Sequence, residues 1–134
     1  ERFDVVYAHG VIQYTEHPSR MVSEIHRVLR IGGTAILMLY HQDSWLMWMS
    51  RVTKVGLEHE GAPAFWTFSL KEARRLVDAF RSVRVVPERF PVATKLHHGW
   101  KALVYNKVFV PSFHALPTAL TRRFGWHLMI WAVK

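Results

Sequence analysis

Two apolar runs near the start of the chain flank a segment in which apolar residues recur at helical spacing. The first run spans residues 5–7 and the second spans residues 35–40. The apolar positions of the segment between them are Met21, Val22, Ile25, Val28 and Leu29. A strand, an amphipathic helix and a second strand in this order predict a right-handed βαβ crossover within a parallel sheet.

Residues that favour helix ends agree with this prediction. Pro18 suits the first turn of a helix, because its missing N–H would have no intrahelical partner there. Gly32 and Gly33 supply the positive φ that commonly ends a helix, so we expect the helix to stop at this pair. Residues 36–39 are apolar at every position, which predicts a strand that is covered on both faces.

Two helices are expected in the middle of the chain. Residues 45–49 are apolar almost without interruption, so the helix predicted there is buried or forms the wall of a pocket. Ser69 and Glu72 have the spacing of a capping box, which predicts the start of a second amphipathic helix.

Two further strands are expected in the second half. Residues 82–86 have the pattern of a strand, and we expect Pro87 to end it. Residues 126–133 form a closing strand that is apolar on both faces and therefore lies inside the sheet. Between these strands, Leu116 and Pro117 can begin one short helix.

Composition narrows the classes of protein to which the chain can belong. Half of its 134 residues are hydrophobic, which argues against disorder. It has no cysteine, which excludes disulfides and cysteine-based metal sites and fits a reducing, cytoplasmic location. The net charge is +8, and most of the excess lies in residues 81–123. This basic lobe is a solvated face or a face that covers the missing half of the domain, or it binds nucleic acid, anionic lipid or an acidic partner.

Two stretches of the sequence carry a resemblance to a known family. They are FDVVYAHGVIQYTEHP at residues 3–18 and EIHRVLRIGG at residues 24–33. Together they resemble the second half of class I S-adenosylmethionine-dependent methyltransferases, in the small-molecule branch that includes ubiquinone and menaquinone C-methyltransferases. Tyr14 stands where a histidine is usual in that family, and Ile31 replaces the usual proline. The segment that begins at Gly125 is similar to the family's last strand.

The resemblance implies an α/β fold that is the C-terminal half of a Rossmann-like methyltransferase sheet. About four strands are expected, with the last one antiparallel and inserted between the two before it, which gives the order first, second, fourth, third. The family's glycine-rich cofactor loop is missing, because no GxG occurs. We therefore expect residues 1–134 to be the C-terminal part of one domain that lacks its N-terminal half and is inactive as a fragment.

The resemblance also places a cofactor site. Ala8, His9 and Gly10 leave the first strand at its carboxyl end, beside the methionine part of S-adenosylmethionine in the family. Gly10 otherwise serves only to permit the turn. Tyr14 matches a position near the mouth of that site, where its phenol hydrogen-bonds a substrate or packs on the following helix. No histidine pattern typical of a metal site occurs, so metal binding is not expected.

Further candidates come from the edge at which the second strand ends. His41 follows that strand and could take a proton from a nucleophile, although a loop histidine is more commonly a structural one. The candidate substrate contacts are Tyr40, Trp45, Trp48 and Trp100. Residues 45–66 and 88–125 are expected to be insertions that cap the substrate above the carboxyl edge of the sheet.

The sequence thus predicts an enzyme that transfers a methyl group from S-adenosylmethionine to a small, apolar acceptor, as part of a longer protein. The expected partners are this acceptor and the missing half of the domain. Peripheral membrane contact is compatible with the basic lobe, and nucleic acid is not expected. The alternative is a basic, aromatic-rich module that binds nucleic acid or membrane without catalysis.

Overall fold

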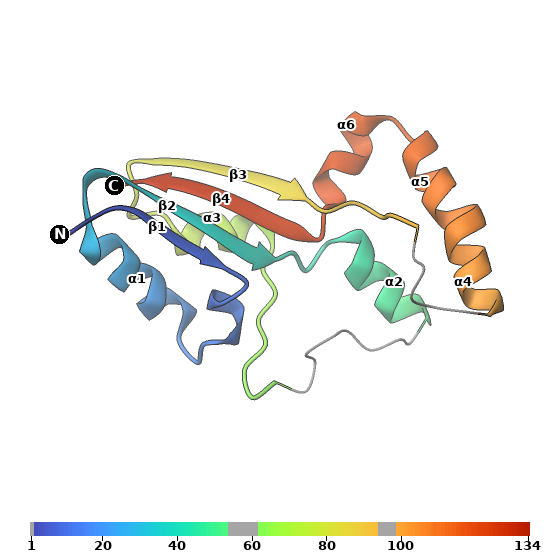
Figure 1. Cartoon of the computed structure of the whole chain (residues 1–134), viewed down its shortest axis with the longest axis horizontal. Coiled ribbons are helices and arrows are strands. Elements are labelled where there is room, and N and C mark those ends of the chain that lie inside the picture. The colour runs from blue at the N-terminus through green and yellow to red at the C-terminus, as the bar shows by residue number, and fades with distance from the viewer. Residues whose placement is uncertain (1, 54–61, 94–98) are drawn as a thin grey trace.

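The structure is a computed structural model that describes residues 2–53, 62–93 and 99–134 (Figure 1). In these ranges the elements are β1 (Phe3–His9), η1 (Ile12–Tyr14), α1 (Pro18–Val28), β2 (Leu29–Tyr40), α2 (Trp45–Thr53), α3 (Leu70–Leu76), β3 (Ser82–Glu88), α4 (Trp100–Val104), the π-helical η2 (Tyr105–Phe109), α5 (Val110–Ala115), α6 (Thr118–Thr121), η3 (Arg122–Phe124) and β4 (His127–Val133).

The four strands form one sheet in the order β1-β2-β4-β3. β1 and β2 are parallel and are joined through α1, as expected for a βαβ crossover. β4 is antiparallel to both of its neighbours and lies between β2 and β3 (Figure 1). The predicted strand order and the antiparallel closing strand are therefore confirmed.

The predicted end of the first helix is wrong. α1 stops at Val28, and the chain is already in β2 at Leu29, which pairs with β1. Gly32, with φ of 77°, lies within β2, where the register against β1 shifts. The backbone N–H of Gly32 donates to the Lys134 carbonyl, and the Lys134 ammonium donates to the Leu29 carbonyl. These contacts with the end of β4 hold residues 29–33 in the sheet in place of another helical turn.

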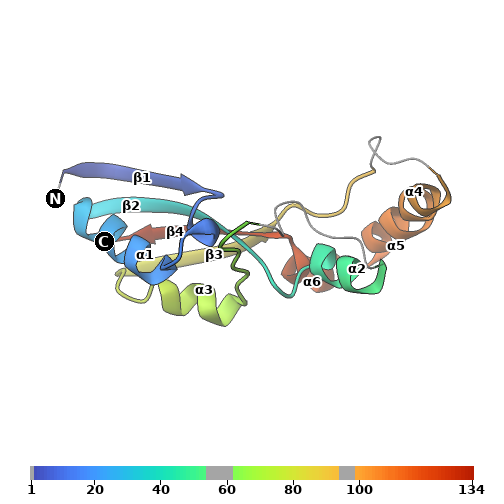
Figure 2. The same cartoon turned by 90° about the horizontal axis from the view of Figure 1, so that it is seen from below.

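Helices cover one face of the sheet. α1 and α3 lie together below it in Figure 2, and the core between them is fully buried at Leu37, Leu39 and Ile130. Side chains of the opposite face are more exposed, with Val5 at 55% and Tyr7 at 64%. The central strands are thus covered by the described helices on one face, whereas the sequence predicts cover on both.

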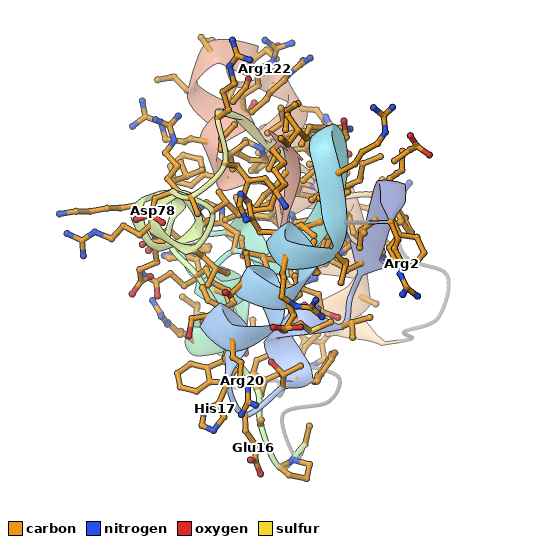
Figure 3. The ribbon with its side chains drawn as sticks, turned by 90° about the vertical axis from the view of Figure 1, so that its left-hand side faces the viewer. Arg2, Glu16, His17, Arg20, Asp78 and Arg122 are labelled. Carbon is orange, nitrogen blue, oxygen red and sulfur yellow. The ribbon has the colours of Figure 1, made fainter. Side chains whose placement is uncertain are left out.

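The solvent side of α1 is polar. Figure 3 shows Glu16, His17 and Arg20 projecting outward around the start of this helix, and all three are exposed. The buried side consists of Val22 and Ile25, as the helical spacing of the apolar residues predicts.

The capping box at the start of α3 is confirmed. The backbone N–H of Glu72 donates to the Ser69 hydroxyl, and the Ser69 backbone N–H donates to the Glu72 carboxylate. The same interactions lower the pKa of Glu72, with the backbone hydrogen bond from Ser69 as the largest cause. α3 is therefore fixed by local chemistry as well as by its buried face.

Pro87 does not end the third strand as the sequence predicts. β3 continues to Glu88, and Pro87 pairs with Leu128 of β4. β3 is an edge strand, so the missing N–H of a proline can face away from the sheet without the loss of a ladder hydrogen bond.

The remaining helices lie beyond the carboxyl ends of β1, β2 and β3 (Figure 1). Residues 99–124 form a helical arm that contains α4, η2, α5, α6 and η3. α6 follows Pro117 as predicted, but the other helical segments of the arm were not expected. α2 has no buried residue, and Trp48 is 57% exposed, so of the two predicted alternatives a buried helix is excluded and the wall of a pocket stays a prediction. Within the described ranges, no helix has the length and apolar character needed to cross a bilayer.

Candidate active site

Side chains from all four strands gather at one edge of the sheet. β1 ends at His9, β2 at Tyr40 and β3 at Glu88, while β4 begins at His127. The strand register places His127 between Tyr40 and Glu88. This carboxyl edge is where open α/β sheets bind ligands.

An aromatic cluster is centred on Tyr40. Its ring stacks on Trp126 with the centroids 4.5 Å apart and 16° between the planes. The Phe65 ring lies 5.7 Å away, and the Tyr14 ring approaches edge-on at 6.1 Å. The Tyr14 hydroxyl donates to the Tyr40 hydroxyl at 3.1 Å. Two polar groups are thus held at the rim of an apolar surface, an arrangement typical of small-molecule sites.

His127 extends this cluster toward two basic groups. Its ring lies 5.8 Å from Tyr40 and 5.9 Å from His9. Arg89 Nη1 donates to His127 Nε2 at 3.3 Å, so the proton of the neutral ring sits on Nδ1. Burial, and after it the charges of Arg89 and His9, lower the pKa of His127 to about 4. His127 is therefore neutral at physiological pH and accepts a hydrogen bond.

The turn after β1 contains Gly10 and a buried amide. Gly10 has φ of 70°, which disfavours a side chain, and a β-carbon there would lie 3.4 Å from Met38 Cε. Gln13 is fully buried, and within the described ranges neither its side-chain nitrogen nor its side-chain oxygen has a hydrogen-bond partner. Ala8, just before the turn, is also buried. An unpaired amide in a buried turn is costly and calls for a polar partner.

His41 is held as a link between strands. The ring is 1% exposed, and its Nδ1 donates to the Gly125 carbonyl at 3.0 Å. The backbone N–H of His41 donates to the Trp126 carbonyl. The Gly125 position has no room for a side chain, since a β-carbon would lie 2.5 Å from backbone atoms of Glu88. This packing gives His41 a structural place at the start of β4.

The tryptophans expected to contact substrate are separated in the structure. The Trp45 indole N–H donates to the Arg89 carbonyl at 2.9 Å, which brings α2 to the edge of the sheet. Trp48 is largely exposed on α2, and Trp100 is 73% exposed at the start of α4, with its ring 6.0 Å from the Lys101 ammonium. Neither is in contact with the described residues of the Tyr40 cluster.

The structure therefore brings His9, Tyr14, Tyr40 and Trp45 to one edge. Sequence reasoning missed four members of this site, which are Phe65, Arg89, Trp126 and His127. It also missed Gln13, although a polar residue within the apolar run of residues 11–14 is a signal that could have identified it. Among the described residues, no group of histidine and acidic side chains could hold a metal ion.

Part of the chain matches a known protein family. Residues 1–37 match a family described as a methyltransferase domain, and they include β1, α1 and most of β2. No curated protein matches the chain.

Solved structures match the chain over almost its whole length. A SAM-dependent methyltransferase from Thermotoga maritima has a TM-score of 0.65 at 20% identity, covering 100% of this chain and 56% of that protein. One from Archaeoglobus fulgidus has a TM-score of 0.58 at 12% identity, covering 99% and 60%. One from Methanosarcina mazei has a TM-score of 0.51 at 18% identity, covering 98% and 59%. The chain thus has a Rossmann-like methyltransferase fold and spans little more than half the length of these proteins.

Proposed function

We propose that the complete protein transfers a methyl group from S-adenosylmethionine to a small acceptor bound at the carboxyl edge of the sheet. The observation that carries this proposal is the convergence of the Tyr40 cluster and the Gly10 turn on that edge. The methyltransferase match over residues 1–37 includes the strand and turn that form one side of the site.

The turn that follows β1 is suited to the methionine part of the cofactor. Gly10 lets the backbone approach a ligand closely, and the side-chain amide of Gln13 has no hydrogen-bond partner among the described residues. We assign Ala8, His9 and Gly10 to the wall of the cofactor site, with Gln13 as a polar group beside it. When bound, S-adenosylmethionine supplies an activated methyl group, so alignment and exclusion of water are the main tasks left to the protein.

The aromatic cluster is suited to the acceptor. The half-buried ring of Tyr40, which stacks on the buried Trp126, offers an apolar wall for a small molecule with an apolar or aromatic body. We assign the linked hydroxyls of Tyr14 and Tyr40 to orienting the acceptor, with Tyr14 as the hydrogen-bonding partner of the reacting group. In this proposal His41 does not contact the acceptor, because its ring is buried and its Nδ1 donates to the Gly125 carbonyl.

We propose that other parts of the domain complete the sheet and the cap. β1 is an edge strand with exposed apolar residues, which suits pairing with strands that belong to an N-terminal half of the same domain. The described parts of residues 45–66 and 88–125 extend beyond the carboxyl edge, where they can cover the acceptor (Figure 1). The alternative of a noncatalytic nucleic-acid- or membrane-binding module gains no support from the comparisons.

A matched pair of glycine substitutions tests the proposal in the complete protein. Gly10 and Gly32 both have positive φ, but Gly32 lies near the opposite edge and has open space around it. Gly10→Val and Gly32→Val should therefore each cost about 1–2 kcal/mol of stability. Only Gly10→Val should weaken S-adenosylmethionine binding and transfer of its labelled methyl group, by about tenfold or more.

Calorimetry and a radiolabel assay against a panel of small acceptors measure these effects. If Gly10→Val kept the wild-type affinity for S-adenosylmethionine and the wild-type rate of methyl transfer, the turn after β1 would not be part of the cofactor site. Absence of any S-adenosylmethionine binding by the complete wild-type protein would overturn the proposed function.

A further inference from the structure

Arg89 occupies an unusual backbone conformation at the carboxyl edge. It follows β3 directly and has φ of 60°, the one positive φ of a non-glycine residue in the described part of the chain. The Arg89 carbonyl accepts the Trp45 indole N–H at 2.9 Å and the Trp126 backbone N–H at 3.2 Å. Two elements of the site thus hold a strained residue in place, and such strain is often found at ligand-binding positions.

Only part of the hydrogen-bonding capacity of the Arg89 guanidinium is taken up by the described residues. One of its nitrogens donates to His127 at 3.3 Å. Two other arginines, Arg27 and Arg30, are paired with the carboxylates of Glu24 and Asp4, and Arg84 lies over the Trp131 ring. Among the described residues, no carboxylate forms an ion pair with Arg89. A guanidinium has five N–H donors in a planar fork, so donors remain for a carboxylate.

The surroundings of Arg89 connect this positive charge to the aromatic wall. His127 lies between them, bonded to Arg89 and 6.3 Å from the Trp126 ring and 5.8 Å from the Tyr40 ring. Because His127 is neutral at physiological pH, it adds no second charge, and its Nε2 accepts a hydrogen bond from the guanidinium. A charged fork beside a flat apolar wall matches a ligand with an acidic group on an aromatic body.

We propose that Arg89 binds a carboxylate of the methyl acceptor, whose aromatic body lies against Tyr40. This inference rests on the proposed function and names the substrate class for the same site. The carboxylate would accept hydrogen bonds from the free N–H groups of Arg89. The body of the acceptor would then be directed toward the Tyr14 and Tyr40 hydroxyls.

Binding of benzoate and benzamide to the complete protein tests this assignment. The two probes have nearly the same shape but differ in charge, and calorimetry or ligand-detected NMR gives their affinities. We expect benzoate to bind about tenfold more tightly than benzamide. Arg89→Gln should abolish this preference. Arg84→Gln, which removes an exposed arginine of β3 that lies over Trp131, should leave the preference intact.

Arg89→Gly separates a binding role from a purely structural one. Glycine adopts a φ of 60° without strain, so this variant should keep the wild-type melting temperature or exceed it while losing the preference for benzoate. Equal affinities for the two probes in the wild-type protein, or an undiminished preference in Arg89→Gln or Arg89→Gly, would overturn the proposal. If the protein preferred benzoate but did not bind S-adenosylmethionine, the proposed function would be contradicted, whereas the carboxylate site at Arg89 would still be supported.

Discussion

His127 is the residue whose chemistry is most altered by its surroundings. The side chain is 8% exposed and accepts a hydrogen bond from Arg89. Burial, together with the charges of Arg89 and His9, lowers the pKa of this imidazole from 6.5 to about 4. The folded protein therefore holds His127 neutral over a range in which the unfolded chain would protonate it.

This depressed pKa predicts a loss of stability in acid. Between pH 6.5 and about 4 the unfolded state binds the proton and the folded state does not, so the free energy of unfolding falls as the pH is lowered through this window. Urea unfolding at a series of pH values measures the effect. His127→Gln, which cannot titrate, should show a flatter pH dependence than the wild type. Equal slopes for the two proteins would contradict the assigned environment.

At the scale of elements, the helical arm is held by a ladder of aromatic rings. Tyr105 and Phe109 stack with their centroids 5.5 Å apart, and Phe109 also lies 6.0 Å from Phe113 and 6.1 Å from Trp45. The π-helical turn of η2 carries Tyr105 and Phe109 on this inner side. The aromatic residues of the insertion thus divide into those that fix the arm and those, such as Trp100, that face solvent.

This division predicts opposite outcomes for two alanine substitutions. Phe109→Ala should lower the free energy of unfolding by about 1–3 kcal/mol, because a partly buried ring leaves a gap in the ladder. Trp100→Ala should change stability by less than about 0.5 kcal/mol, since its ring is largely exposed. Chemical denaturation measures both. If the two substitutions had equal effects on stability, the aromatic contacts of Phe109 would not be what stabilises the helical arm.

At the scale of the whole molecule, the described helices cover only one face of the sheet. α1 and α3 bury one face, while the other face exposes Val5 and Tyr7 beside the free edge of β1 (Figure 2). The chain spans 56–60% of the length of the three methyltransferases compared above. It contains the edge proposed to bind the methionine part of the cofactor, but no GxG pattern that could form a phosphate- or cofactor-binding loop.

We therefore predict that residues 1–134 alone bind S-adenosylmethionine at least ~100-fold more weakly than the complete protein. Under the proposed function, the cofactor would meet the turn after β1 but none of the contacts that an N-terminal half of the domain would supply. Isothermal titration of both forms makes the comparison, with circular dichroism to verify that the shorter form is folded. Micromolar binding by residues 1–134 would show that the Gly10 turn and its neighbours suffice.

The sequence by itself determined the elements whose signals are local. The βαβ unit, the capping box at Ser69 and the interior position of β4 follow from periodicity and cap chemistry, which depend on residues close together in the chain. Tyr40 could be predicted as a site residue because strand ends meet at one edge of a parallel sheet, and Tyr14 because it matches a position in the family that the sequence resembles.

Only the tertiary structure decided the features that depend on distant partners. β2 begins at Leu29, before the glycine pair, because the last residue of the chain bonds to it across the sheet. Pro87 lies within β3 because that strand is at an edge. Arg89 and His127 are 38 residues apart in sequence, and the antiparallel insertion of β4 brings them into contact. Pattern and propensity report on neighbours along the chain, whereas the charge and aromatic surface of this site arise from strands that meet only after folding.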